Sequence, residues 1–273
     1  MALREHDIQF ESIPIHVWEG GQGFPILMLH GSGAGASIVG NFRRVLDGLS
    51  KSYRVLAADL VGFGLSGDKP QEPYFDMDLW LRQAKFLINR LSADSIGIIG
   101  HSLSGAIALK AAADDKRVTK VLTTGTMGAP HVEEPGVLGG GWTYPEDRTE
   151  LRRFVESTVD DKAKVEEQDI DYRERILRRD GYRDYYKNMF KGPRGQYINA
   201  SALTDDELKR VKSDVVMMHG ANDGSFTPEE TTLRLARKLP QADVVLLGGC
   251  GHSVAFEYPK KFLAVCDMLF GKA

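Results

Sequence analysis

The chain alternates between short apolar runs and longer segments with helical periodicity. Continuous apolar runs such as PILML and VVMM are typical of strands that are buried on both faces. Segments such as residues 76–92 have the pattern of amphipathic helices and separate these runs. Because strands and helices alternate over most of the chain, we expect a parallel sheet whose crossover helices cover both of its faces.

The individual elements can be placed to within a few residues. Residues 7–19 alternate between apolar and polar side chains and predict an opening strand pair. The parallel strands are expected at 25–31, 53–62, 95–102, 118–125, 213–220 and 242–249. The helices between them are expected at 39–51, 76–92, 103–114 and 227–238, with a last helix from Pro259.

The alternation stops at about residue 129 and resumes near residue 206. Residues 130–205 contain charged helical segments and clustered aromatic side chains, with no convincing buried strand. The simplest architecture is one α/β core formed by residues 1–129 and 206–273, interrupted by a helical insertion at 130–205.

Composition and charge exclude several classes of protein. Apolar residues make up 42% of the chain and charged residues 27%, with a net charge of -3. No stretch concentrates lysine and arginine without acids, so we expect no nucleic-acid partner. The N-terminal residues lack the apolar core of a signal peptide, and no apolar run approaches about 18 residues, so we expect no membrane segment. Two cysteines, Cys250 and Cys266, do not form a disulfide scaffold and favour a cytoplasmic location.

The stretch IIGHSLSG contains the first candidate for chemistry, Ser102. A buried strand ends at Gly100 and a helical segment begins at Leu103, which places Ser102 on a sharp strand-to-helix turn. A serine at a helix start is often only a capping residue. The usual nucleophile pattern also has glycine where this chain has Ser104, although Gly105 follows directly.

Two further residues favour a nucleophilic role for Ser102. Asp223 and His252 each follow the carboxyl end of a predicted strand, where open α/β sheets bind their ligands. The order serine, acid, histidine is the order of a catalytic triad on this kind of scaffold. Asp59 also follows a strand but precedes the serine in the chain, so we expect it to stabilise a turn.

The glycine-rich loop HGSGAGA supplies the remaining part of such a site. Backbone N–H groups near Ser32 and Gly33, together with that of Leu103, are expected to form an oxyanion hole. The loop does not fit a nucleotide-binding pattern. His219 ends a strand but has no metal-ligand partner at a useful spacing, so we expect neither a metal nor a cofactor.

The assembled motifs resemble the α/β-hydrolase superfamily over essentially the whole chain. They are HGSGAGA, DLVGFGLSG, GHSLSG, HGANDGSFTP and GGCGHS. The resemblance implies an α/β-hydrolase fold with an eight-stranded, mostly parallel sheet and a helical cap. Residues 136–156 and the stretch MFKGPRGQY are similar to the meta-cleavage-product hydrolases. These enzymes split the C–C bond of 2-hydroxy-6-oxo-dienoates in bacterial degradation of aromatic compounds.

The narrower resemblance also implies roles for individual residues. Arg194 matches the arginine that holds the substrate carboxylate, and Ser32 matches a serine of the oxyanion region. His101 stands where that family has asparagine and Ser253 where it has tryptophan, and both positions contact the substrate there. Trp142 is a candidate for contact with an apolar substrate tail.

Three functions remain open from the sequence. C–C hydrolysis of a small carboxylated substrate with an apolar tail is the first, and hydrolysis of small esters or lactones is the second. The third is a receptor that hydrolyses its ligand slowly, because the G-H-S-x-S turn also occurs in the karrikin and strigolactone receptor group. The sequence leaves open whether the chain forms a homodimer or a larger homo-oligomer.

Overall fold

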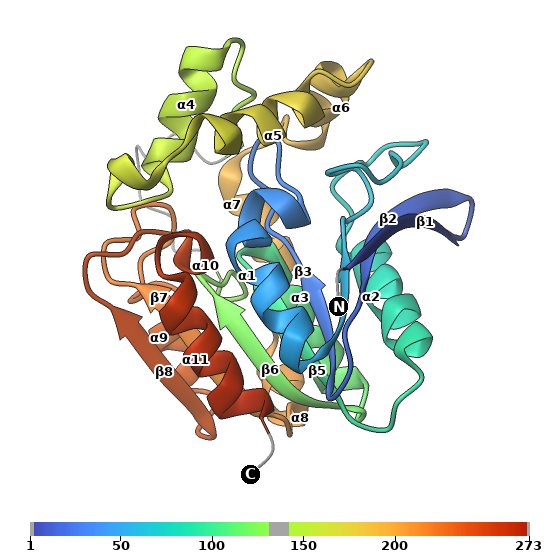
Figure 1. Cartoon of the computed structure of the whole chain (residues 1–273), viewed down its shortest axis with the longest axis vertical. Coiled ribbons are helices and arrows are strands. Elements are labelled where there is room, and N and C mark those ends of the chain that lie inside the picture. The colour runs from blue at the N-terminus through green and yellow to red at the C-terminus, as the bar shows by residue number, and fades with distance from the viewer. Residues whose placement is uncertain (1–2, 131–141, 272–273) are drawn as a thin grey trace.

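Eight strands form one sheet in the computed structural model, which describes residues 3–130 and 142–271 (Figure 1). They are β1 (Arg4–Phe10), β2 (Ile13–Gly20), β3 (Pro25–Leu29), β4 (Arg54–Ala58), β5 (Ile96–His101), β6 (Val118–Thr124), β7 (Asp214–Gly220) and β8 (Ala242–Leu247). Their order in the sheet is β1-β2-β4-β3-β5-β6-β7-β8. β1 and β2 are antiparallel to each other, β2 is antiparallel to β4, and the other pairs are parallel.

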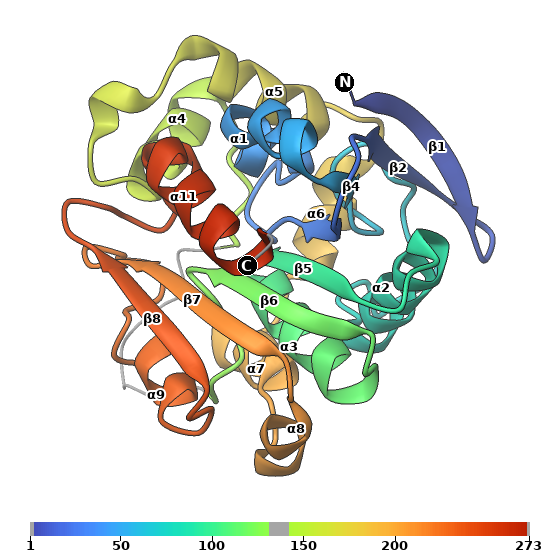
Figure 2. The same cartoon turned by 60° about the horizontal axis from the view of Figure 1, so that its bottom comes forward.

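Helices cover both faces of this sheet (Figure 2). On one face lie α1 (Ile38–Ser52), α10 (Val254–Glu257) and α11 (Pro259–Phe270). On the other lie α2 (Met77–Leu91), α3 (Leu103–Asp114), α8 (Asp205–Arg210) and α9 (Thr232–Ala236). Among the described residues, none of the helices is long and apolar enough to cross a membrane.

The burial of β5 explains why the sheet is parallel and covered on both faces. All of its residues, from Ile96 to His101, are buried, although side chains along a strand point alternately to opposite faces. A strand of this kind needs helices on both sides, which the crossover connections supply. The expected fold, a mostly parallel eight-stranded sheet surrounded by helices, is confirmed.

Residues 142–204, called here the helical segment, lie above the carboxyl ends of the parallel strands (Figure 1). The described part of the chain has no strand between β6 and β7. Residues 136–141, part of the stretch that carried the narrower resemblance, lie outside the described ranges. The segment contains α4 (Arg148–Ser157), η1 (Lys162–Lys164), α5 (Glu167–Leu177), α6 (Tyr182–Met189) and α7 (Arg194–Ser201).

One buried carboxylate fastens the helical segment to the core. Asp169 of α5 accepts hydrogen bonds from Arg43 Nε at 2.8 Å and from Arg44 Nη2 at 3.2 Å, and both arginines belong to α1. Charge-assisted bonds of this kind are among the stronger polar contacts in proteins. They keep α5 in place over the loop between β3 and α1.

Two short helices differ from the expectation. The helix expected over 227–238 is limited to α9, because Thr231 has φ -123° and ψ -85°, which are not helical angles. The residues before it form turns, in which Thr231 N–H donates to the carbonyl of Thr227. The four-residue helix α10 was not expected, because it is too short to give a periodic pattern.

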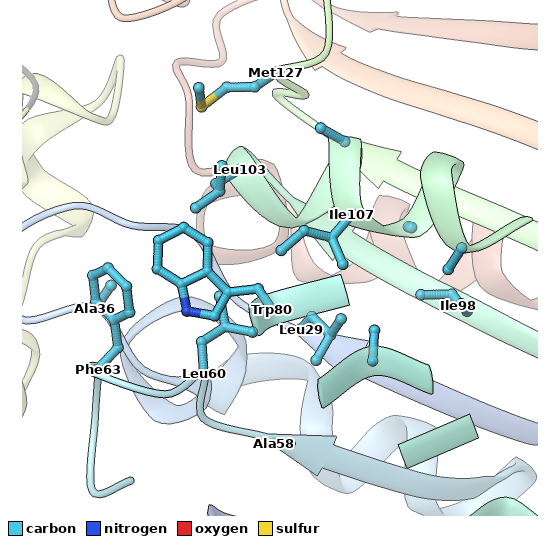
Figure 3. Packing of buried hydrophobic residues seen from close by; sticks show 14 of the residues in the cluster. Leu29, Ala36, Ala58, Leu60, Phe63, Trp80, Ile98, Leu103, Ile107 and Met127 are labelled. Carbon is cyan, nitrogen blue, oxygen red and sulfur yellow. The ribbon is translucent and has the colours of Figure 1, made fainter. Parts of the chain in front are cut away.

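The apolar core beneath the turn after β5 is built around aromatic and branched side chains (Figure 3). Trp80 of α2 packs between Phe63 and Phe75, with ring centroids 5.9 and 5.0 Å away. Its indole N–H donates to the carbonyl of Val61 at 3.0 Å, so the buried polar atom is satisfied. Leu103, the first residue of α3, is fully buried in the same cluster and anchors the start of that helix.

Glycine at position 105 lets α3 approach the loop after β6. A Cβ atom added to Gly105 would lie 2.1 Å from Oγ1 and 2.7 Å from Cβ of Thr126. Thr126 is fully buried and its hydroxyl donates to the carbonyl of Met127, so it has little freedom to move. The close packing of helix against loop therefore depends on this glycine.

We predict that Gly105→Ala lowers the free energy of unfolding by about 1–3 kcal/mol, the usual cost of inserting a methyl group into a packed interior. Urea denaturation followed by circular dichroism measures this. Gly248→Ala is the matched control, because a Cβ added at Gly248 would meet no described atom within 4 Å apart from its own chain neighbours. Equal urea midpoints for the two variants would contradict the packing argument.

Candidate active site

Ser102 occupies a strained turn between β5 and α3. Its backbone angles are φ 55° and ψ -117°, in a region that residues other than glycine rarely adopt. Three hydrogen bonds hold the turn: Ser102 N–H donates to the carbonyl of Thr124 at 2.9 Å, and the Ser102 carbonyl accepts from the N–H groups of Gly105 and Met127. The side chain then stands at the wall of a cavity above the sheet.

Ser104, which departs from the usual glycine, has its own function in the turn. Its hydroxyl donates to the carbonyl of His30 at 2.5 Å and is fully buried. The hydroxyl bonds across to the residue that follows β3 and not back into the first turn of α3. The extra hydroxyl thus ties the start of α3 to the glycine-rich loop.

Asp223 and His252 form a buried hydrogen-bonded pair. Oδ2 of Asp223 lies 2.7 Å from Nδ1 of His252, and Asp223 is only 3% exposed. Oδ1 accepts from the backbone N–H groups of Ser225 and Phe226 at 2.8 and 3.0 Å. Burial by itself would raise the pKa of Asp223, but the charge of His252 and the hydrogen bonds hold it well below its ordinary value. The carboxylate is therefore ionised at neutral pH.

His252 and Ser102 lie on the wall of the same cavity. Because Nδ1 of His252 is engaged with Asp223, Nε2 is the nitrogen left to accept a proton. Oγ of Ser102 and Nε2 of His252, both within the described residues, are not hydrogen-bonded to each other in this structure. Catalytic hydrogen bonds are often long in unliganded enzymes and shorten when substrate binds. The arrangement is that of a serine nucleophile, a base and an acid that orients the base.

His101 packs beside His252. The ring centroids of His101 and His252 are 4.7 Å apart. Nδ1 of His101 lies 3.1 Å from the carbonyl of Thr124, which can only accept, so Nδ1 carries the proton. Burial, followed by the charge of His252, lowers the pKa of His101 well below its ordinary value. His101 is therefore a neutral part of the cavity wall.

The glycine-rich loop is held from above by aromatic side chains. Oγ of Ser32 accepts from the indole N–H of Trp142 at 2.9 Å, and the Ser32 carbonyl accepts from the hydroxyl of Tyr186 at 3.3 Å. A Cβ atom added to Gly33 would lie 2.7 Å from Cζ of Phe154, so the helical segment packs directly on the loop. Ser32 and Gly33 face the same cavity as Ser102. Leu103 begins α3, so its N–H has no partner within the helix.

The cavity combines aromatic walls with a few polar groups. Of the residues expected at the site, Ser32, Gly33, His101, Ser102, Trp142, His252 and Ser253 line it. Sequence reasoning did not identify another eight: Gly31, Ala36, Asn41, Phe154, Thr158, Arg173, Ser225 and Phe226. Within the described ranges, no three His, Cys, Asp or Glu side chains are arranged to hold a metal ion.

Arg173 of α5 is the cation of this cavity. Its side chain is 5% exposed, and Nη1 donates to the carbonyl of Ala34 at 2.8 Å. No carboxylate in residues 3–130 or 142–271 forms an ion pair with it. Burial lowers the pKa of Arg173 to about 10, so the guanidinium stays charged at neutral pH. A buried charge without a partner is costly, and an anionic ligand would offset that cost.

Arg194, expected to contact the substrate, has different neighbours. Its Nη2 donates to the carbonyl of Ser225, and its guanidinium lies 5.0 Å from the ring centroid of Phe226. Arg194 does not line the cavity that contains Ser102. Its contacts join the start of α7 to the loop that carries Asp223.

One signal in the sequence could have identified Arg173. Ile170, Arg173 and Leu177 are spaced three and four residues apart, and all three are buried on one side of α5. A charged residue within an apolar stripe is rarely buried without a functional reason. Several other arginines follow in the same stretch, so composition by itself does not distinguish Arg173 from them.

Comparison with known proteins agrees with this geometry. Residues 26–265 match the alpha/beta hydrolase family. The chain belongs to this family. The match covers the sheet from β3 to β8, the turn at Ser102 and the positions of Asp223 and His252.

Several relatives are similar over almost the whole chain. The 2-hydroxymuconate semialdehyde hydrolase of Pseudomonas sp. (strain CF600) is 29% identical over 262 residues, covering 96% of this chain and 92% of the relative. A 2-hydroxy-6-oxononadienedioate/2-hydroxy-6-oxononatrienedioate hydrolase of Dechloromonas aromatica (strain RCB) is 30% identical, covering 96% of this chain and 91% of the relative.

Solved structures of similar proteins have the same fold. A variant of the meta-cleavage product hydrolase CumD has a TM-score of 0.89 at 27% identity, covering 98% of each chain. The 2-hydroxy-6-oxo-6-phenylhexa-2,4-dienoate hydrolase of Rhodococcus sp. strain RHA1 has a TM-score of 0.87 at 25% identity, covering 97% of this chain and 98% of that one.

We predict that Ser102→Ala folds normally and loses at least about a thousandfold in kcat, because the variant lacks the hydroxyl that we expect to act as the nucleophile. A fluorophosphonate probe should label the wild type and leave Ser102→Ala unlabelled. Ser104→Ala is the matched control: it removes a neighbouring hydroxyl that bonds to His30 and should keep the labelling. Labelling of the Ser102→Ala variant would overturn the assignment of the nucleophile.

Proposed function

We propose that this chain is a cofactor-independent serine hydrolase that splits the C–C bond of a 2-hydroxy-6-oxo-dienoate. The observation that carries the proposal is the buried guanidinium of Arg173 on the same cavity as Ser102 and His252. A substrate with a carboxylate at one end and a carbonyl group further along could contact both. The names of the relatives, all hydrolases of such compounds, support this substrate class.

The reaction begins when His252 removes the hydroxyl proton of Ser102. Oγ then forms a bond to the 6-oxo carbon of the substrate, and the carbonyl oxygen becomes an oxyanion. Backbone N–H groups near Ser32, Gly33 and Leu103 would stabilise this charge. Asp223 stabilises the imidazolium of His252 that forms at the same time.

The C–C bond breaks in the second step. The keto tautomer of the substrate forms when the proton of the 2-hydroxyl group moves to C5, the carbon next to the 6-oxo carbon. C5 is then saturated and attached to a double bond that is conjugated with the 2-oxo acid. When the tetrahedral intermediate collapses, the electron pair of the C–C bond spreads over this 2-oxo acid as a dienolate. Arg173 would stabilise this anion by binding the carboxylate of the substrate. His252 then gives the proton that it took from Ser102 to the dienolate.

Water completes the cycle. The tail of the substrate remains bound to Ser102 as an ester. His252 accepts a proton from water, the hydroxide attacks the ester carbon, and Oγ of Ser102 leaves and regains its proton. The products are a 2-hydroxydienoate and a carboxylic acid, and no redox or cofactor step is required.

The cavity walls favour a flat, apolar tail. Trp142 stacks on Phe190 with ring centroids 5.1 Å apart and an interplanar angle of 3°, and its indole is fixed by Ser32. Phe154 and Phe226 add two further aromatic surfaces. Ser253 and Thr158, whose hydroxyls are 3.1 Å apart, give the wall a small polar area beside His252.

Hydrolysis of small esters or lactones is the second candidate. Ser102, His252 and the oxyanion groups would act in the same way on an ester carbonyl. These groups do not require the substrate to carry a carboxylate. The neutral His101 and the small Ser253 favour this candidate, because neither side chain supplies charge to a carboxylate.

The two buried thiols, Cys250 and Cys266, are free and fit a cytoplasmic enzyme.

We predict that Arg173→Gln lowers kcat/KM for a carboxylated dienone. The loss should correspond to about 2–4 kcal/mol of transition-state stabilisation, the order of effect seen when a buried charge loses its partner. The loss for a neutral p-nitrophenyl ester should be small, because that substrate has no carboxylate. Steady-state kinetics on both substrates with the same enzyme preparation measure the difference.

Arg194→Ala is the matched control for this experiment. Arg194 does not itself line the cavity but contacts Ser225 and Phe226, which do, so its loss should change both activities to a similar, small degree. A selective loss on the dienone in Arg194→Ala, with none in Arg173→Gln, would assign the carboxylate to Arg194. Wild-type activity on esters without activity on dienones would favour the esterase.

A further inference from the structure

A second histidine, His219, binds the same carboxylate oxygen as the catalytic histidine. Nε2 of His219 lies 2.9 Å from Oδ2 of Asp223, and Nδ1 of His252 lies 2.7 Å from the same atom. His219 stands near the end of β7 and is fully buried. The reaction described above makes no use of this side chain.

The neighbours of His219 determine where its proton lies. Nε2 is 2.8 Å from the carbonyl of Phe226, which can only accept, so Nε2 carries the hydrogen. Nδ1 lies 2.7 Å from Oγ1 of Thr232, whose hydroxyl can donate to it. The ring thus donates from Nε2 toward Asp223, and Nδ1 pairs with the hydroxyl of Thr232.

With His219, Asp223 has a complete set of donors. Oδ1 accepts two backbone N–H groups, and Oδ2 accepts one N–H group from each histidine. The hydrogen bond from His219 contributes to the low pKa of Asp223. It also fixes the direction in which Oδ2 points, because His219 and the loop residue Phe226 are joined by the bond to the Phe226 carbonyl.

Sharing Oδ2 has a consequence for His252. A carboxylate oxygen raises the proton affinity of an imidazole by stabilising its protonated form. A second donor on the same oxygen draws charge away and weakens this stabilisation. His252 must be neutral to accept the proton of Ser102, so the donors that share Oδ2 with it bear on its role as a base.

Few other titratable groups face this pair. His101 at the end of β5 and Cys250 after β8 lie beside it, and Arg194 at the start of α7 is close enough to interact with the charge of Asp223. Burial keeps His101 neutral and raises the pKa of Cys250, so neither changes charge near neutral pH. Arg194 stays a constant cation, and so does Arg173 of α5, which lines the same cavity as His252. A change in the titration of His252 is therefore attributable to His219.

We propose that His219 is a positioning residue that fixes Oδ2 of Asp223 toward His252 and sets the pH above which His252 acts as a base. The proposal rests on the catalytic roles proposed for Ser102, Asp223 and His252. A merely structural His219 would hold the loop of residues 220–226 together, and its loss would lower activity equally at every pH.

The test compares three variants with the wild type. His219→Gln keeps an N–H donor near the position of Nε2, His219→Leu removes it, and Thr232→Val removes only the hydroxyl behind the ring. Nitrogen NMR of the imidazole rings gives the titration of His252 directly and needs no substrate. The pH profile of kcat/KM on p-nitrophenyl acetate gives the same titration through activity.

In His219→Leu, the titration of His252 should move to higher pH by about one unit, since a hydrogen bond to a charged group is worth that order of effect. Thr232→Val should move it in the same direction by less, and His219→Gln should restore wild-type behaviour. Thr123→Val is the matched control: Thr123 is also a fully buried threonine, but its hydroxyl has no hydrogen-bond partner among the residues that the structure describes. It should leave the titration unchanged.

An unchanged titration of His252 in His219→Leu would overturn the proposal and leave His219 a structural residue. If His219→Leu does not fold, an unchanged titration in Thr232→Val overturns it equally. Failure of the proposed function is a separate outcome: the wild type would hydrolyse neither dienone nor ester, while the NMR titrations would still support or refute the coupling.

Discussion

The strained turn at Ser102 is the constraint on which the rest of the site depends. β5 runs to His101 and α3 starts at Leu103, so a single residue reverses the chain with φ 55°. The turn is possible because a glycine lies on each side of it: a Cβ at Gly100 would lie 2.1 Å from the carbonyl oxygen of Ser104, and one at Gly105 equally close to Thr126. The hydroxyl of Ser104 adds a bond to His30, so the loop that is expected to bind the oxyanion is fixed to the same turn.

Two buried charges of opposite sign differ in how the protein balances them. Asp223 accepts four N–H groups, from two histidines and two backbone positions, and is satisfied within the chain. Arg173 has one hydrogen bond to the Ala34 carbonyl and no carboxylate partner among the described residues. Both side chains are almost completely buried. The charge of Asp223 is balanced within the protein, whereas that of Arg173 is suited to binding an anion.

The sheet and the helical segment contribute different residues to the site. The sheet and its loops carry Ser102, Asp223, His252 and His219, whereas Arg173, Trp142 and Phe154 come from the helical segment above the sheet (Figure 1). The segment is held in place by Asp169, which binds two arginines of α1. Substrate preference can therefore change with the helical segment while the reaction centre stays the same, as is common when one fold serves several substrates.

The apolar runs and helical periods of the sequence were enough to locate the strands and most of the core helices, although the helix expected over 227–238 is shorter and α10 was not expected. Polar residues that follow predicted strands were enough to propose Ser102, Asp223 and His252. Each of these predictions depends on a local signal: an apolar run, a helical period, or a polar residue directly after a strand. Only the tertiary structure decided which arginine reaches the cavity, because Arg173 and Arg194 both lie in charged helical stretches and differ only in where α5 and α7 pack. The hydrogen bonds of His219 to Asp223 and of Ser104 to His30 could not be predicted from the sequence either. Each depends on the distance between two segments in the folded chain. A residue's local pattern predicts its element, but its partner across space depends on packing distances that no local pattern contains.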